Sequence, residues 1–103
     1  MLKLNAYGET YNVYLYPCRY LEPQNLCINI ELEDGEPWST MTVNLGGFLK
    51  DGYAFVDTNN NPGIEEFIRK NKLGFFTGEC QSSGFCIYPL YKFNMAVIEK
   101  YMR

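Results

Sequence analysis

The chain has 103 residues, enough for one domain with one hydrophobic core. Apolar residues make up 47% and charged residues 20%, a balance typical of globular proteins rather than disordered chains. No apolar stretch approaches the roughly 20 residues of a membrane-spanning helix, and residues 1–5 turn polar too early for a signal peptide. We therefore expect a single domain over residues 1–103 in the cytoplasm, without membrane contact.

Charge is divided unevenly along the chain. Residues 1–68 hold ten acidic and three basic side chains, whereas residues 69–103 hold two acidic and six basic ones, so the net charges are −7 and +4. This division argues against the continuous basic face that simple nucleic-acid binding requires. It favours an acidic surface that meets a basic partner, and it leaves the basic C-terminal third as a candidate RNA contact.

The residue types that usually carry catalysis or bind metals are sparse. The sequence has no histidine, the usual general base near neutral pH and the usual partner of a Ser or Cys nucleophile. The four cysteines (Cys18, Cys27, Cys80 and Cys86) include no Cys-x-x-Cys pair, which most zinc sites contain. We expect reduced thiols and no metal, cofactor, small-molecule substrate or enzymatic activity.

The first two-thirds of the chain shows strand patterns separated by turn residues. Residues 26–33 alternate strictly between apolar and mostly polar side chains, as a half-buried antiparallel strand does. Gly8-Glu9 and Asp34-Gly35 are typical of turns. The predicted strands are residues 2–6, 10–16, 26–33, 38–45 and 53–57.

The last third begins with the best helix pattern. Asn61 as N-cap and Pro62 in the first turn predict a main helix over about residues 62–73, and Gly74 fits its C-terminal end. Residues 78–84 are rich in Gly and Ser and predict a loop. A last strand at 85–88 is expected to be broken by Pro89 or confined by it to a sheet edge, and Asn94 is expected to cap a short C-terminal helix.

These elements predict an α+β fold. We expect an antiparallel sheet of five or six strands, with the main helix packed on one face and the short helix near the C-terminus.

The candidate binding residues lie around the Asp34-Gly35 turn. Its carboxylates are those of Glu31, Glu33, Asp34 and Glu36. Their spacing does not match a calcium loop, and a solvent-facing hairpin tip is the simplest interpretation. As a functional site, they favour a charged contact with a basic partner. Tyr14 and Tyr16 share one face of their predicted strand and are candidate aromatic anchors.

Two other features are weaker candidates. The glycine-bounded segment 78–84 leads into a strand instead of a helix, which disfavours a phosphate cradle. Aromatic residues cluster early and late in the chain, and the late group lies near Lys92 and Lys100, an arrangement compatible with an RNA contact. The two groups are Tyr7, Tyr11, Tyr14, Tyr16 and Tyr20, and Phe85, Tyr88, Tyr91 and Phe93.

Several short motifs resemble a family of small uncharacterised proteins carried on plasmids, phages and conjugative elements of Gram-positive bacteria. The motifs are Asp34-Gly35-Glu36-Pro37, Thr42-Val43-Asn44-Leu45, the run from Phe55 to Asn60, and Ser83-Gly84-Phe85 followed by Tyr88-Pro89-Leu90-Tyr91. The resemblance implies an anti-CRISPR protein that binds the type II effector Cas9 and blocks guide-RNA loading or DNA engagement.

Two alternatives stay open at this point. One is an accessory protein of a mobile element, either an antirestriction factor or a regulatory module that binds nucleic acid. The other is a nuclease that uses carboxylates and a divalent metal.

Overall fold

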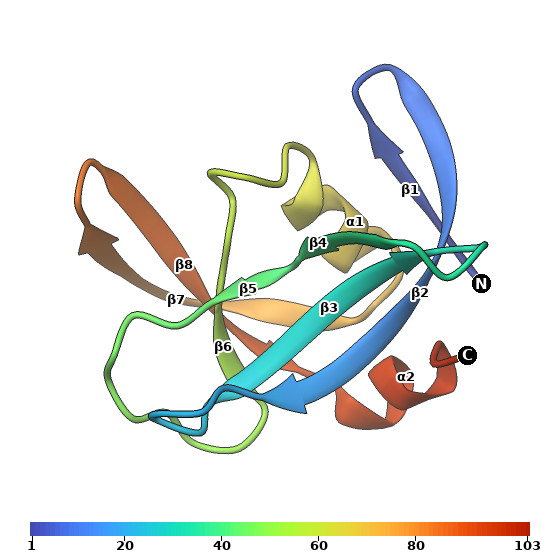
Figure 1. The fold of residues 1–103 in the computed structure, drawn as a ribbon. Coiled ribbons are helices and arrows are strands. Elements are labelled where there is room, and N and C mark those ends of the chain that lie inside the picture. Colours follow the sequence, from blue (N-terminus) through green and yellow to red (C-terminus); the bar gives the residue numbers. More distant parts are fainter.

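The computed structural model describes residues 1–103 and contains eight strands and two short helices (Figure 1). About half of the residues lie in strands. The strands are β1 (Leu2–Ala6), β2 (Glu9–Arg19), β3 (Leu26–Leu32), β4 (Pro37–Thr40), β5 (Thr42–Val43), β6 (Tyr53–Val56), β7 (Gly74–Ser83) and β8 (Cys86–Phe93). The helices are α1 (Ile64–Lys70) and α2 (Met95–Lys100).

The first sheet has the order β1-β2-β3-β4, and every pairing is antiparallel. Its alternating residues explain the two faces: Val13 and Leu15 are buried against the core, while Tyr14 and Tyr16 point to the opposite face. The predicted N-terminal hairpin and the predicted strand at 26–33 are therefore confirmed as β1–β2 and β3.

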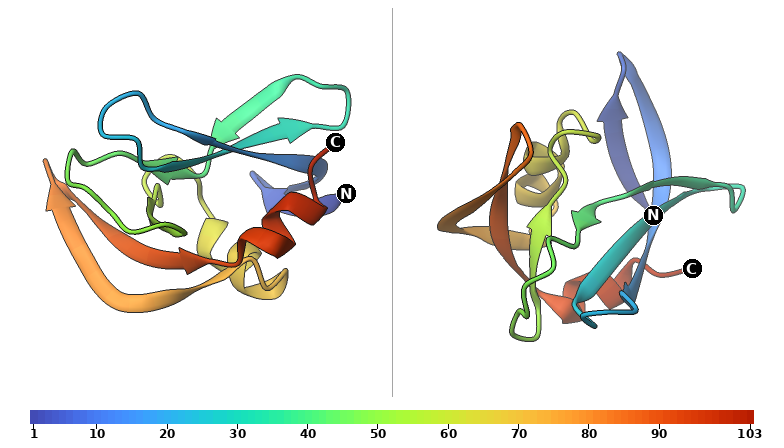
Figure 2. Two further views of the ribbon diagram at one scale, coloured as in Figure 1. Left: turned by 90° about the horizontal axis from the view of Figure 1, so that it is seen from below. Right: turned by 60° about the vertical axis from the view of Figure 1, so that its left-hand side comes forward.

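The second sheet has the order β5-β6-β8-β7 and is also antiparallel. Met41 joins the two sheets: its N–H donates to Ile28 O in β3 at 2.8 Å, and its carbonyl accepts from Asp57 N, just after β6, at 2.9 Å. The strand predicted over 38–45 is thus divided at Met41 into β4 and β5, which belong to different sheets. Figure 2 shows the two sheets as separate layers.

The main core lies between the two sheets and is completed by the helices. Ile64, Phe67 and Ile68 of α1 and Ile98 of α2 are buried in it. The α1 helix lies beside β1 and contacts β7, so it fills the gap between the outer strands of the two sheets. At the other side, Leu15 N of β2 donates to Tyr101 O, just after α2, at 3.0 Å.

The predicted fold class was partly right. The molecule is α+β, but its eight strands form two sheets, and no main helix over 62–73 covers the face of a single sheet. The main helix spans only Ile64–Lys70, because left-handed backbone at Gly63 and at Lys72 bounds it on either side. Helices this short derive their stability from packing rather than from propensity.

The two asparagines predicted as helix caps, Asn61 and Asn94, show why the start of the main helix was mispredicted. Asn61 does not cap α1: its side chain bonds to Ser39 and to the carbonyl of Thr40 in β4. Asn94, by contrast, caps α2 as predicted, since its side chain accepts from Val97 N at 3.4 Å. Only the second asparagine lacks a tertiary partner that competes with capping.

The predicted loop over 78–84 was wrong, because residues 78–83 belong to the edge strand β7 and only Gly84 lies in a turn. With β8, this strand forms a long two-stranded ribbon that projects from the molecule (Figure 1). Small polar residues suit a strand that is exposed on both faces. The β8 strand also continues through Pro89, where the pairing with β7 shifts register between Phe76 and Cys80.

Candidate functional site

The structure places the six predicted contact residues next to one another on the first sheet. Tyr14 and Glu31 are directly opposed on β2 and β3, on the face that points away from the core, and Tyr16 opposes Asn29 on the same face. Glu33, Asp34 and Glu36 lie at the turn between β3 and β4, at the end of this face. We call these residues the acidic face: Tyr14, Tyr16, Glu31, Glu33, Asp34 and Glu36.

The turn of the acidic face is well ordered by its own hydrogen bonds. Leu32 N donates to Glu36 O at 2.8 Å, and Gly35 N donates to Leu32 O at 2.9 Å. Asp34 accepts the N–H of Glu36 through its side chain at 3.0 Å, the bond that makes Asp a good turn residue. Gly35 has a φ of 93°, so a side chain there would be strained.

Arg103 fixes this turn from outside the sheet. Its guanidinium donates to Leu32 O at 3.0 Å and to Glu33 O at 2.7 Å. It also lies 4.5 Å from the ring centre of Tyr14 and 4.0 Å from the carboxylate of Glu31. The guanidinium of Arg103 therefore partly covers the ring of Tyr14.

Three acids of the turn remain without a cationic partner. The molecule has only two ion pairs, Arg19–Asp51 and Arg103–Glu31, and neither involves Glu33, Asp34 or Glu36. The side chain of Glu33 accepts only a 3.3 Å bond from the amide of Asn12. All three side chains are exposed. The turn therefore presents three carboxylates that take part in no ion pair within the fold.

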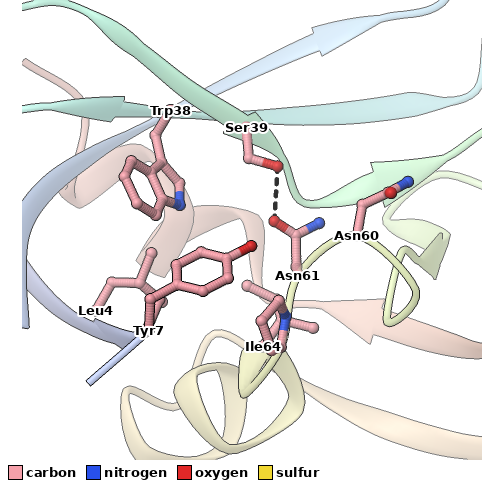
Figure 3. A pocket seen from close by; sticks show the side chains of 9 residues that line it. Leu4, Tyr7, Trp38, Ser39, Asn60, Asn61 and Ile64 are labelled. Atoms are coloured by element: carbon pink, nitrogen blue, oxygen red, sulfur yellow. Dashed lines mark hydrogen bonds between the residues drawn. The ribbon is translucent and has the colours of Figure 1, made fainter. Parts of the chain in front are cut away.

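An aromatic pocket lies on the core side of the first sheet, around Trp38 of its edge strand β4, and was not anticipated from the sequence (Figure 3). The β3–β4 pairing shifts register between Ile30, which opposes Ser39, and Glu31, which opposes Pro37. Trp38 therefore has no partner in β3, and its side chain is redirected. Trp38 lies 4.5 Å from Tyr11 and 6.3 Å from Tyr7, measured between ring centres. The pocket of about 180 Å³ opens beside these rings.

Tyr7 lines this pocket and lies in a strained turn. Tyr7 and Gly8 form the two-residue β1–β2 turn, and both have positive φ, at 53° and 78°. A type I′ turn of this kind normally takes Asn-Gly, and a bulky residue there costs about 1 kcal/mol or more. The Tyr7 side chain is nevertheless 72% exposed, so burial does not compensate for the strain. Such strain is typical of residues kept for a binding role.

The other wall of the pocket is rigid and uncharged. Asn61 donates to Thr40 O and Asp57 O at 2.9 and 3.0 Å, and it accepts from Ser39 Oγ at 2.6 Å, the bond drawn in Figure 3. Every capacity of this amide is used within the fold, apart from one acceptor lone pair. No charged side chain lines the pocket, so it suits an apolar or aromatic group.

Part of this pocket could have been predicted from the sequence. Trp38 is the single tryptophan of the chain and directly follows the acidic turn, and exposed Trp and Tyr are the residues most enriched at binding hot spots. The register shift that redirects its side chain, however, depends on pairing between strands and leaves no local pattern.

The cysteines form no cluster with other ligands. All four are free, and no three Cys, Asp or Glu side chains converge as in a metal site. Cys18 and Cys27 are directly opposed on β2 and β3. Partial burial, together with the neighbouring Cys27, raises the pKa of the Cys18 thiol to about 11. This thiol is therefore protonated at neutral pH and is a poor nucleophile.

Fold and site together define a small two-sheet α+β domain with an exposed acidic turn and an aromatic pocket around Trp38 of the strand that follows this turn. The chain belongs to the family described as a domain of unknown function, DUF4313, whose model matches residues 2–103. No curated protein and no solved structure matches the chain. Neither helix has the length and apolar character that a membrane crossing requires.

Proposed function

We propose that this protein acts by binding, without catalysis, and that it inhibits a basic protein partner in the bacterial cytoplasm. The partner that the sequence resemblance implies is Cas9, with guide-RNA loading or DNA engagement as the blocked step. The contact surface comprises the acidic face and the aromatic pocket formed by Tyr7 and Trp38.

The observation that carries this proposal is the uncompensated charge of a rigid turn. Glu33, Asp34 and Glu36 are exposed and unpaired, while Arg103 and the turn's own bonds hold their backbone in place. A preorganised loop loses little conformational entropy on binding. The fold thus supplies a fixed patch of negative charge, which a basic protein groove would attract.

Charge and aromatic surface would contribute differently to the complex. Exposed acids mainly accelerate association and exclude wrong partners, and their effect weakens with added salt. Buried Trp and Tyr side chains supply most of the affinity in typical interfaces. The pocket at Trp38 is therefore the proposed anchor, and the turn at Glu33–Glu36 directs the basic partner to it.

The first test is a binding measurement with purified, guide-free Cas9. The variant Glu33→Lys/Glu36→Lys reverses two exposed charges but keeps Asp34, whose side chain closes the turn. We expect its affinity for Cas9 to fall at least about ten-fold, which corresponds to about 1.4 kcal/mol.

A matched control changes the same net charge elsewhere. Glu22→Lys/Glu79→Lys reverses two exposed acids, one in the β2–β3 loop and one in β7. We expect its affinity to stay within about two-fold of wild type, because exposed charges more than a Debye length of about 8 Å away are screened. Equal losses in both variants would contradict the assigned surface, and absence of wild-type binding would contradict the partner.

A further inference from the structure

A second surface of the molecule contains a basic cleft. A cleft of about 650 Å³ lies where the end of α1, the start of β7, the end of β8 and the start of α2 meet. Three cations line it, Arg69, Lys72 and Lys92, against a single acid, Asp51. Asp51 is paired with Arg19 at 3.4 Å, outside the cleft lining. The cleft therefore carries a net positive charge in a protein whose total charge is −3.

The floor of this cleft adjoins a row of alternating aromatic and cationic side chains. Phe75 of β7 opposes Lys92 of β8, and Lys92 opposes Tyr53 of β6, so the three side chains share one face of the second sheet. The ammonium group of Lys92 lies 4.8 Å from the ring centre of Tyr53. Phe75 is 63% exposed and lines the cleft, so its ring is free to stack on a ligand.

Lys72 is held at the edge of the cleft by the end of α1. Its φ of 55° lies in the left-handed region, at the position after a helix where glycine is the usual residue. Lys72 N donates to Arg69 O at 3.2 Å and Leu73 N donates to Ile68 O at 3.0 Å, the two bonds of a Schellman motif, which accounts for this backbone conformation. The motif thus fixes the backbone that carries the third cation of the cleft.

We propose that this cleft binds single-stranded nucleic acid. A base stacks on Phe75, and the neighbouring phosphates contact Arg69, Lys72 and Lys92. This combination of an exposed aromatic ring and a basic groove is the one that single strands require. A free phosphate would make no use of the exposed ring, and a duplex would keep its bases stacked inside. The site is independent of the acidic face.

The test is fluorescence anisotropy with a labelled decathymidine strand at low salt. We expect the wild-type protein to bind it, with a slope of log K against log salt of about −2 for three phosphate contacts. Phe75→Ala is expected to weaken binding about ten-fold. Its control is Phe85→Ala, which removes a more exposed ring at the far tip of the same hairpin and should leave binding unchanged.

Lys72→Gly separates binding from stability. Glycine relieves the left-handed strain, so this variant should be at least as resistant to urea as wild type, yet it should bind the strand several-fold more weakly. Glu33→Lys/Glu36→Lys should retain the Phe75-dependent binding, which distinguishes this site from the proposed Cas9 contact. The inference would be overturned if the wild-type protein did not bind the strand, or if Phe75→Ala bound it as tightly as wild type does. It would also be overturned if inorganic phosphate displaced the strand at a concentration equal to that of the strand.

Discussion

Replacing Met41 by alanine is expected to destabilise the fold by about 3 kcal/mol, within the range measured for large-to-small core substitutions. The Met41 side chain is fully buried in the main core, and its backbone bonds to Ile28 and Asp57 join the two sheets. The other core residues fix the spacing between the two sheets, so the cavity left by the Met41 side chain cannot collapse fully. Urea unfolding followed by circular dichroism measures the change.

Met102 provides the matched control for this substitution. Its side chain is 40% exposed, so Met102→Ala should change the free energy of unfolding by less than about 0.5 kcal/mol. If Met41→Ala were equally mild, the junction between the sheets would be looser than the structure shows.

Gly74→Ala is the second substitution with a large expected effect. A Cβ atom at this position would lie 2.6 Å from the carbonyl oxygen of Lys92 and 3.1 Å from Cα of Phe93, both in the paired strand β8. Backbone atoms cannot move aside as a flexible side chain would, so β7 must shift away from β8. We expect a loss of about 2–3 kcal/mol in the free energy of unfolding, as for overpacked sites.

Gly47→Ala is the control for the loss of a glycine. Gly47 is exposed, its backbone is outside the left-handed region, and no atom lies within 4 Å of the added Cβ. Alanine there should leave stability unchanged or raise it by a few tenths of a kcal/mol, because it restricts the unfolded chain. Similar unfolding curves for both variants would show that β7 does not approach β8 as closely as described.

Local signals predicted the parts of the fold that local chemistry determines. The period-two pattern of Leu26–Leu32 and the turn at Asp34-Gly35 correspond to β3 and the turn after it. Asn94 caps α2 because no other group competes for its side chain. In each case the residues that form the element also carry the information that specifies it.

Long-range contacts determine the parts that were mispredicted. Asn61 has the local signature of a helix cap, but Ser39 and Thr40 bind its side chain from β4. The division into two sheets depends on Met41, whose surroundings show no break in the strand pattern. Residues 78–84 have loop composition, and 78–83 become a strand only because β8 lies beside them.

The candidate site divides in the same way. Charge counting along the sequence identified the acidic turn, and strand periodicity placed Tyr14 and Tyr16 on one face of their strand. The pairing of Tyr14 with Glu31 follows from the strand register, which the sequence did not predict. The cover that Arg103 provides and the pocket at Trp38 depend on residues far apart in the chain. Sequence reasoning therefore predicts where charge is exposed, but not which aromatic rings remain free beside it.

An order-of-addition assay of DNA cleavage by Cas9 tests the proposed inhibition most directly. The wild-type protein and the Glu22→Lys/Glu79→Lys control, added before the guide RNA, are expected to suppress cleavage. Glu33→Lys/Glu36→Lys should suppress it far less. Suppression that persists when the protein is added after the guide would identify DNA engagement as the blocked step. Full cleavage with the wild-type protein in both orders, or guide RNA degraded in a magnesium-dependent reaction, would contradict inhibition by binding.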